Sequence, residues 1–200
     1  MGCLGKFGGR TRRHTHHMSE IETERLRLRP LGVGDLDAWH RQIFSDPEVT
    51  RYLPVRNPIP REDAVERLAS QVESCQVRGF GVWAVLEKAS NQLVGHSGFV
   101  TPEASDRIEL IYALGRDWWG RGFATEAAAA CLRHGFEVLD FTEIAALAFP
   151  ENEPSIHVML KLGFVFEDVV PRFGVELVRY KVNADSFWAS SHARLGGTSE

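Results

Sequence analysis

Cysteine and long apolar stretches are both scarce in this 200-residue sequence, and each shortage excludes a class of protein. The three cysteines, Cys3, Cys75 and Cys131, are widely spaced and odd in number, so they match neither a disulfide framework nor a zinc pattern. Free thiols of this kind are typical of a reducing compartment, and we expect a cytoplasmic protein. Apolar runs such as residues 144–149 are too short to cross a bilayer, so no membrane partner is expected.

An excess of positive charge is also lacking. The 23 Lys and Arg residues are outnumbered by 27 Asp and Glu residues, which leaves a formal net charge of -4. No overall basic field would attract nucleic acid, so we expect no nucleic-acid partner. With 44% hydrophobic and 25% charged residues, the composition favours an ordinary globular domain.

The first eighteen residues differ from the rest in composition. Glycines, basic residues and three histidines (His14, His16 and His17) occur there without apolar periodicity. No apolar segment follows the charges, so the segment does not resemble a secretory signal, and Lys6 stands where a myristoylation pattern needs Ser or Thr. We expect residues 1–18 to be a disordered leader or an expression remnant, residues 19–183 to form one domain, and residues 184–200 to be a C-terminal tail.

Apolar spacing in the first half predicts one strand, two helices and three further strands. Leucines alternate with arginines from Leu26 and predict a strand that Pro30 ends. A helix is predicted from Asp35 to Phe44, and an apolar stripe predicts a second from Pro60 to Gly79. Period-two patterns then predict strands over residues 80–86, 92–100 and 107–114.

The second half alternates between helices and strands. Residues 123–139 form the clearest predicted helix, inside which Gly135 indicates close packing. We expect a strand over 143–149, a short helix over 154–162 and strands over 164–167 and 175–182. Residues 183–200 lack a pattern, although Phe187 and Trp188 could dock on the core. Neighbouring strands favour antiparallel pairs and strand-helix-strand favours a parallel crossover, so the predicted fold class is α/β (α+β mixed sheet), mostly antiparallel and flanked by helices.

A glycine-containing loop precedes the clearest helix. Gly120 and Gly122 allow a ligand to approach the backbone, and the unpaired N–H groups of the first helical turn favour an anion. A Walker A loop is excluded because Phe123 and Ala124 follow the last glycine in place of Lys and Ser or Thr. A Rossmann fingerprint is excluded because Thr125 replaces the small residue needed for helix packing. The loop therefore predicts a phosphate-binding site of another kind.

A second motif lies beyond the strand at 143–149. Residues 152–155 read Asn-Glu-Pro-Ser and are followed by Met-Leu-Lys-Leu-Gly-Phe at 159–164. Together with residues 119–127, this stretch resembles the paired signature of the GNAT N-acetyltransferases. Residues 23–29 and 46–49 resemble the RimJ/RimL-like branch of that superfamily, and the resemblance covers about residues 21–182. One departure is Trp119, where the superfamily prefers Gln or Arg.

The resemblance implies a GNAT fold that binds acetyl-CoA as co-substrate, without a metal. The pyrophosphate would lie on the amides of residues 120–125, with Arg121 or Arg116 adding charge, and the pantetheine arm would pair with the strand at 107–114. That pairing requires this strand and the strand at 143–149 to part at one end. The implied binding residues are Tyr112, Ala113, Leu114, Trp119, Gly120, Arg121, Gly122, Phe123, Ala124, Thr125 and Asn152.

The expected reaction is direct attack of a primary amine on the thioester in a ternary complex. Glu109 is the predicted base, since alternation puts it on the face shared with Ile111 and Ala113; a solvated or salt-bridged edge residue is the other interpretation. Ser155 matches the family serine near the sulfur, and helix capping is its other interpretation. A backbone N–H near Ile111 or Tyr112 would stabilise the oxyanion.

The acceptor and the oligomeric state stay open on sequence alone. The acceptor site would be built from residues 51–61 and 170–174, and Arg51, Arg56 and Arg61 make an acceptor with a nearby anion conceivable. Protein N-termini, amino acids, polyamines and aminoglycoside-like drugs are all compatible, as are a monomer and a homodimer. A second hypothesis is a GNAT-like module that binds acyl-CoA as a sensor or scaffold without catalysis.

Overall fold

The computed structural model describes residues 18–102, 105 and 107–195, with side chains to residue 191. The expected leader lies outside this range except for Met18. The Met18 side chain is 6% exposed and belongs to the main core cluster. Met18 is therefore part of the core rather than of a leader.

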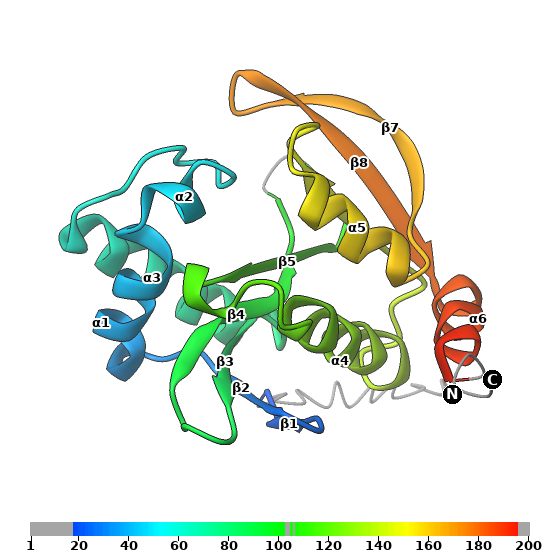
Figure 1. Cartoon of the computed structure of the whole chain (residues 1–200), viewed down its shortest axis with the longest axis horizontal. Helices are drawn as coiled ribbons and strands as arrows, with labels where there is room; N and C mark the ends of the chain where they lie inside the picture. The colour runs from blue at the N-terminus through cyan, green and yellow to red at the C-terminus, as the bar shows by residue number, and fades with distance from the viewer. Residues whose placement is uncertain (1–17, 103–104, 106, 196–200) are drawn as a thin grey trace, which may run out of the picture.

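A single eight-stranded sheet forms the centre of the protein, in the order β1-β2-β3-β4-β5-β6-β8-β7 (Figure 1). Every neighbouring pair is antiparallel except β5 and β6, which are parallel. This confirms the predicted mixed, mostly antiparallel sheet. The strands are β1 (Ile21–Glu22), β2 (Leu26–Pro30), β3 (Val82–Glu87), β4 (Leu93–Val100), β5 (Glu109–Leu114), β6 (Glu143–Ala148), β7 (Val165–Arg172) and β8 (Val175–Asn183).

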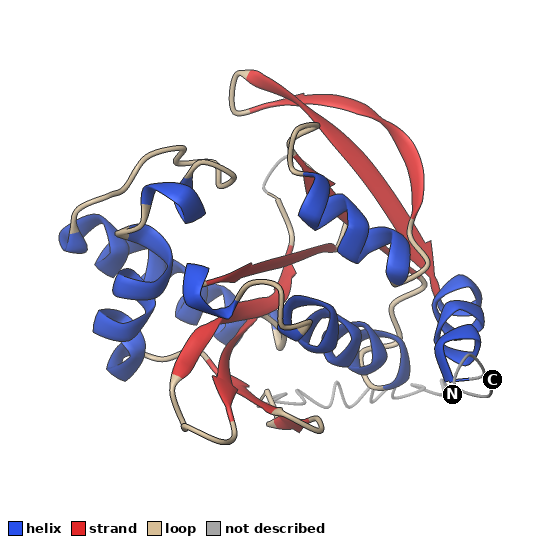
Figure 2. Ribbon diagram, viewed as in Figure 1, coloured by secondary structure: helices blue, strands red, loops and turns tan. Residues whose placement is uncertain are grey.

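Helices cover both faces of the sheet (Figure 2). One core cluster lies under α1 (Leu36–Trp39), the π-helix η2 (His40–Phe44) and α3 (Arg61–Arg78). The larger cluster lies under α4 (Phe123–Glu137), α5 (Glu153–Lys161) and α6 (Ala184–Leu195). Three short helices complete the chain, η1 (Val33–Asp35), α2 (Pro47–Thr50) and η3 (Arg116–Trp118).

Three expectations about secondary structure need correction. The region at 35–44 is helical as predicted but is divided among η1, α1 and η2. Asp35 stands at the N-cap of α1, yet its carboxylate accepts from Arg29 and from the Gly32 N–H before η1 rather than from the first turn of α1. Strand β7 runs to Arg172, five residues beyond the predicted end, because it pairs with β8 along its whole length. Residues 184–195 form α6 instead of a patternless tail.

The suggested docking of the C-terminal segment is confirmed. The Phe187 ring in α6 is fully buried, and Trp188 packs against the same cluster, with the two ring centroids 4.8 Å apart. The close packing predicted at Gly135 is also confirmed, since a Cβ there would lie 2.9 Å from the Phe99 ring. The packing of Phe187 on the core and the approach of Gly135 to Phe99 each join segments far apart in the sequence.

The parallel strands β5 and β6 touch at one end only. Their single paired position joins Glu109 to Ala145, and the Ala145 N–H donates to the Ile108 carbonyl at 2.9 Å. Beyond that point the register of β5 continues only with β4. The expected parting of the two strands is therefore confirmed. The long β7–β8 hairpin arches beside the opening that results (Figure 1).

Candidate active site

A cleft of about 1200 Å³ opens where β5 and β6 diverge. Its walls come from both halves of the protein: the α1–α2 region and α3 on one side, the loop before α4 and the start of α5 on another, and the tip of the β7–β8 hairpin. Among the lining residues are ten of the eleven residues predicted to bind the co-substrate and both predicted catalytic residues. These are Glu109, Tyr112, Ala113, Leu114, Trp119, Gly120, Gly122, Phe123, Ala124, Thr125, Asn152 and Ser155.

The α4 end of this cleft has the geometry of an anion site. Gly120 and Gly122 have φ values of 72° and 78°, a conformation that side chains with a Cβ rarely adopt. The Gly122 carbonyl accepts from the N–H of the fourth helical residue at 3.1 Å. The N–H groups of Phe123, Ala124 and Thr125 have no acceptor among the described residues. These donors line the cleft, so the loop fits a bound pyrophosphate.

The Arg121 side chain stabilises the loop before α4. Its guanidinium pairs with Glu87 at 2.7 Å and lies over the rings of Trp118 and Phe123. Arg121 is absent from the described residues that line the cleft, and Arg116 is exposed without a described ion pair. The groups that face the cleft at this end are therefore backbone N–H groups rather than the arginine side chains expected from sequence.

The free edge of β5 presents alternate residues to the cleft. The Gly115 N–H donates to Val94 in β4, whereas the Ile108 carbonyl faces β6. Since backbone groups alternate along a strand, the N–H groups of Tyr112 and Leu114 face the opening, and those of Ile111 and Ala113 face β4. The Leu114 carbonyl already accepts from the Trp119 indole at 2.8 Å. The sequence offered the N–H groups of Ile111 and Tyr112 as oxyanion donors. Only the Tyr112 N–H faces the opening between β5 and β6.

Ser155 is hydrogen bonded to the Tyr112 side chain. The Tyr112 hydroxyl lies 3.0 Å from the Ser155 carbonyl and 2.9 Å from its hydroxyl. Because the phenol has one proton and the carbonyl can only accept, the Ser155 hydroxyl donates to the phenol oxygen. Burial raises the pKa of Tyr112 to about 12. Helix capping was the other interpretation of Ser155. The N-cap of α5 is Asn152, whose side chain accepts from the Ser155 N–H at 3.3 Å.

Glu109 is buried and ion-paired. The Nη1 group of Arg172, at the end of β7, lies 2.8 and 2.7 Å from its two carboxylate oxygens. A carboxylate has about four lone-pair positions, so sites remain for a further donor. Both features weighed from sequence therefore hold together: Glu109 is salt-bridged, and it lines the cleft.

Glu109 and Ser155 approach the opening from opposite faces of the sheet. Leu110 and Leu114 belong to the core cluster under α4 and α5, and Tyr112 packs against it with Ser155 at hydrogen-bonding distance. Ala113 belongs to the other cluster, against which Ile111 packs, and strand alternation puts Glu109 on that same face. A group held at the free edge of β5 would thus have a carboxylate on one side and a hydroxyl pair on the other.

His96 in β4 adds a fixed hydrogen-bond donor to the cleft. The Trp39 indole donates to His96 Nδ1 at 3.0 Å, and burial lowers the pKa of His96 to about 4. The imidazole is therefore neutral near pH 7, and its proton must be on Nε2 because Nδ1 accepts. Sequence reasoning missed His96 as a cleft residue, because its place opposite Ala113 depends on the pairing of β4 with β5.

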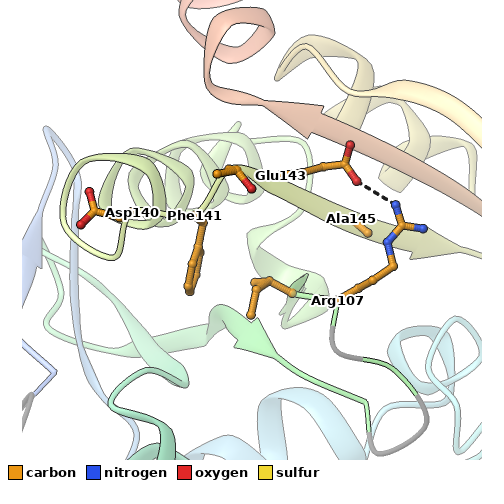
Figure 3. A pocket seen from close by; sticks show the side chains of 7 residues that line it. Arg107, Asp140, Phe141, Glu143 and Ala145 are labelled. Atoms are coloured by element: carbon orange, nitrogen blue, oxygen red, sulfur yellow. Dashed lines mark hydrogen bonds and ion pairs between the residues drawn. The ribbon is translucent and has the colours of Figure 1, made fainter.

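A smaller hollow of about 330 Å³ lies at the joined end of β5 and β6 (Figure 3). The Arg107 and Glu143 side chains that face each other there are ion-paired at 2.8 Å. Its lining residues are Arg107, Ile108, Asp140, Phe141, Thr142, Glu143 and Ala145. Within the described ranges, no three His, Cys, Asp or Glu side chains gather closely enough to hold a metal ion, and no helix is long and apolar enough to span a membrane.

Comparison with known proteins agrees with this geometry. The family model for the acetyltransferase (GNAT) domain matches residues 25–165. The chain belongs to the GNAT acetyltransferase family. It is 32% identical to Uncharacterized N-acetyltransferase p20 of Bacillus licheniformis over 155 residues, 76% of this chain and 86% of that protein.

Two further relatives of this GNAT chain differ in what their names say they act on. It is 36% identical to spermidine N(1)-acetyltransferase of Escherichia coli K12 over 145 residues, covering 71% of this chain and 74% of that enzyme. The fold also matches RimL, the ribosomal L7/L12 alpha-N-protein acetyltransferase, in complex with coenzyme A, with a TM-score of 0.72, 16% identity and coverage of 84% of this chain and 99% of that one. The RimL likeness concerns the fold alone.

The acceptor side of this GNAT cleft differs from its sequence-based picture. The three arginines of residues 51–61 are engaged elsewhere: Arg51 with Glu48 at 3.0 Å, Arg56 with Glu151 at 3.7 Å and Arg61 with Asp37 at 2.7 Å. Two arginines line the cleft, Arg67 from α3 and Arg172 from the second predicted loop. Sequence reasoning did not single out Arg172, because its place at the end of β7 depends on the register of the β7–β8 hairpin.

Proposed function

We propose that the protein transfers an acetyl group from acetyl-CoA to a primary amine by direct attack in a ternary complex. The observation that carries the proposal is the arrangement around the free edge of β5, with Glu109 on one face and the Ser155–Tyr112 pair on the other. Transfer requires an amine nitrogen to attack the thioester carbonyl carbon, the C–S bond to break, one proton to leave the nitrogen and one to reach the sulfur. A base and an acid on opposite sides of the carbonyl meet both needs.

Each step is assigned to a group of the chain. Glu109 accepts the amine proton, directly or through water, at a carboxylate position that Arg172 leaves open. The Tyr112 N–H donates to the oxyanion, an interaction worth about 3 kcal/mol in other acyl transfers. The Ser155 hydroxyl, held in place by the Tyr112 phenol, turns from the phenol oxygen to give its proton to the thiolate. The phenol, protonated at neutral pH, replaces that proton, and solvent reprotonates the phenol after CoA leaves.

Acetyl-CoA would be held mainly by backbone groups. The N–H groups of residues 123–125 receive the pyrophosphate, and the Tyr112 and Leu114 edge receives the peptide-like pantetheine arm. Bound acetyl-CoA supplies the activated acyl group and a good leaving thiolate. A non-catalytic acyl-CoA sensor would need the same cradle, but it would have no use for the base and hydroxyl pair.

An assay of CoA release tests the proposal. The panel should include spermidine, an N-terminal peptide, amino acids and an aminoglycoside, because the relatives named above act on different amines. We expect release above the hydrolysis rate with at least one acceptor, and a larger thermal shift with acetyl-CoA than with adenosine, because only the former reaches the α4 cradle. Stabilisation without release for any amine would favour the sensor, and equal shifts from both ligands would remove the phosphate cradle.

A further inference from the structure

The tip of the β7–β8 hairpin is built to hold one arginine in a defined place. Arg172 is the last residue of β7 and pairs with Val175, so the turn has two residues, Phe173 and Gly174. Their φ values are 54° and 74°, as in the type I′ turn that suits the twist of antiparallel strands. This tight turn fixes Arg172 at the mouth of the cleft, where it meets Glu109.

Only part of the Arg172 guanidinium is used. Nη1 makes both contacts with Glu109, whereas Nε and Nη2 have no partner within the described part of the chain. Those two nitrogens form one bidentate edge of a guanidinium. In the adjacent strand, Arg179 uses the same edge to bind the carboxylate of Asp168, with Nε at 2.8 Å from one oxygen. The unused edge of Arg172 therefore matches a carboxylate.

We propose that the acceptor is an α-amino acid with an apolar side chain, an inference that rests on the proposed acetyl transfer. In such a zwitterion the ammonium and the carboxylate are separated by a single carbon atom. Glu109 and Arg172 are in direct contact at 2.7 Å, so they present opposite charges at a similar spacing. The amine lies against Glu109, and the carboxylate takes the free edge of Arg172. Glu109 thereby both orients the amine and receives its proton.

The rest of the cleft agrees with an apolar amino acid. Apolar residues adjoin the pair: Val100 is paired with Glu109 across β4 and β5, and Phe173 follows Arg172 in the turn. Leu53 and Ile111 also line the cleft. A polyamine would need several carboxylates beside the reacting amine. Glu109 is already matched by Arg172, and the other glutamates that line the cleft, Glu66 and Glu153, come from α3 and the start of α5. A protein N-terminus carries an amide in place of the carboxylate and would leave the edge of Arg172 unfilled.

Binding and turnover with matched ligands test the inference. Three apolar amino acids (L-phenylalanine, L-leucine and L-methionine) are compared with their amides and their decarboxylated amines, by calorimetry on the CoA-bound protein and by CoA release from acetyl-CoA. For at least one series we expect the amino acid to exceed both analogues about tenfold or more in affinity and kcat/KM, as for a lost charge-assisted bidentate contact. Equal values across every series, or preference for the amine, would overturn it.

The Arg172→Lys variant separates recognition from general damage. It keeps the positive charge beside Glu109 but loses the bidentate edge, so the preference for the amino acid should collapse while the amine changes less than about threefold. Arg61→Lys, an exposed ion-paired arginine outside the cleft, is the matched control and should keep the preference. Preference that survives in Arg172→Lys contradicts the assignment.

The two readouts keep this inference distinct from the proposed function. Calorimetry with CoA needs no turnover, so Arg172-dependent amino acid binding without CoA release would support the acceptor site and refute catalysis. Conversely, strong CoA release with spermidine or a peptide and none with the amino acids would support catalysis and refute this acceptor class.

Discussion

At the α4 end of the cleft the groups that face a ligand are backbone N–H groups, whereas at the hairpin end they are side chains from distant segments. The first set comes from residues 120–125 and the free edge of β5. The second includes Glu109 of β5 and Arg172 of β7, which are ion-paired at 2.7 Å although they are far apart in the sequence. A backbone cradle depends on local conformation and tolerates side-chain change, so we expect phosphate binding to be kept with Trp119 in place of Gln or Arg. The side-chain end has no such tolerance and should carry the specificity.

Changing the backbone of the cradle should have the largest effect. Gly122→Val forces a β-branched residue to φ 78° and fills the approach to the α4 amides, so we expect CoA affinity to fall about a hundredfold or more. Gly34→Val is the control, because Gly34 has open space around its Cβ and lies in η1. Calorimetric titration with CoA measures both. Wild-type affinity in Gly122→Val would mean that the phosphates bind elsewhere.

At the side-chain end, the next largest effect is expected from Glu109→Gln. Glutamine cannot accept the proton, so kcat/KM near neutral pH should fall about tenfold to a hundredfold, with CoA affinity unchanged. An amine with a pKa of about 8 to 10 loses its own proton as the pH rises, so part of the loss should be recovered there. Glu66→Gln, another carboxylate that lines the cleft, should show no such pH-dependent recovery. A Glu109→Gln profile that superimposes on wild type removes Glu109 from the mechanism.

Smaller losses are expected from the hydroxyl pair. Ser155→Ala removes the proton donor near the sulfur, and Tyr112→Phe removes the group that orients it, so each should lower kcat by about tenfold or less. Because the two hydroxyls act as one unit, the double variant should lose no more than the worse single variant. Steady-state kinetics on the three variants measures this. Losses that multiply would show that the hydroxyls act independently.

The last prediction concerns stability in acid rather than binding or turnover. His96 has a pKa of about 4 in the fold, lowered by burial, against about 6.5 when unfolded. Between these values the unfolded chain binds a proton that the folded one does not, so stability falls as the pH drops from 6.5 to 4, by up to about 3 kcal/mol. His96→Asn keeps an acceptor for the Trp39 indole but does not titrate. Urea unfolding at pH 7 and 4.5 should show a smaller decline for this variant, and an equal decline would contradict the assignment.

Local signals explain which elements could be predicted. The α4 helix, the α3 stop at Gly79 (φ 77°) and the hairpin strands follow from periodicity and glycine positions alone. By contrast, α2 is a single turn begun by Asp46 and Pro47, and α6 has no apolar stripe strong enough to predict. What stabilises α6 is the burial of Phe187 among residues of other elements, which a local pattern does not contain.

The sequence by itself determined the family, the phosphate loop and the parting of β5 from β6, because each depends on residues adjacent in the chain or on strand order. Only the tertiary structure decided that Arg121 supports the loop through Glu87, that Tyr112 orients Ser155 and that Arg172 meets Glu109. These pairs join residues 34, 43 and 63 positions apart. Their formation depends on strand register and on the hairpin turn, which only the packed sheet defines.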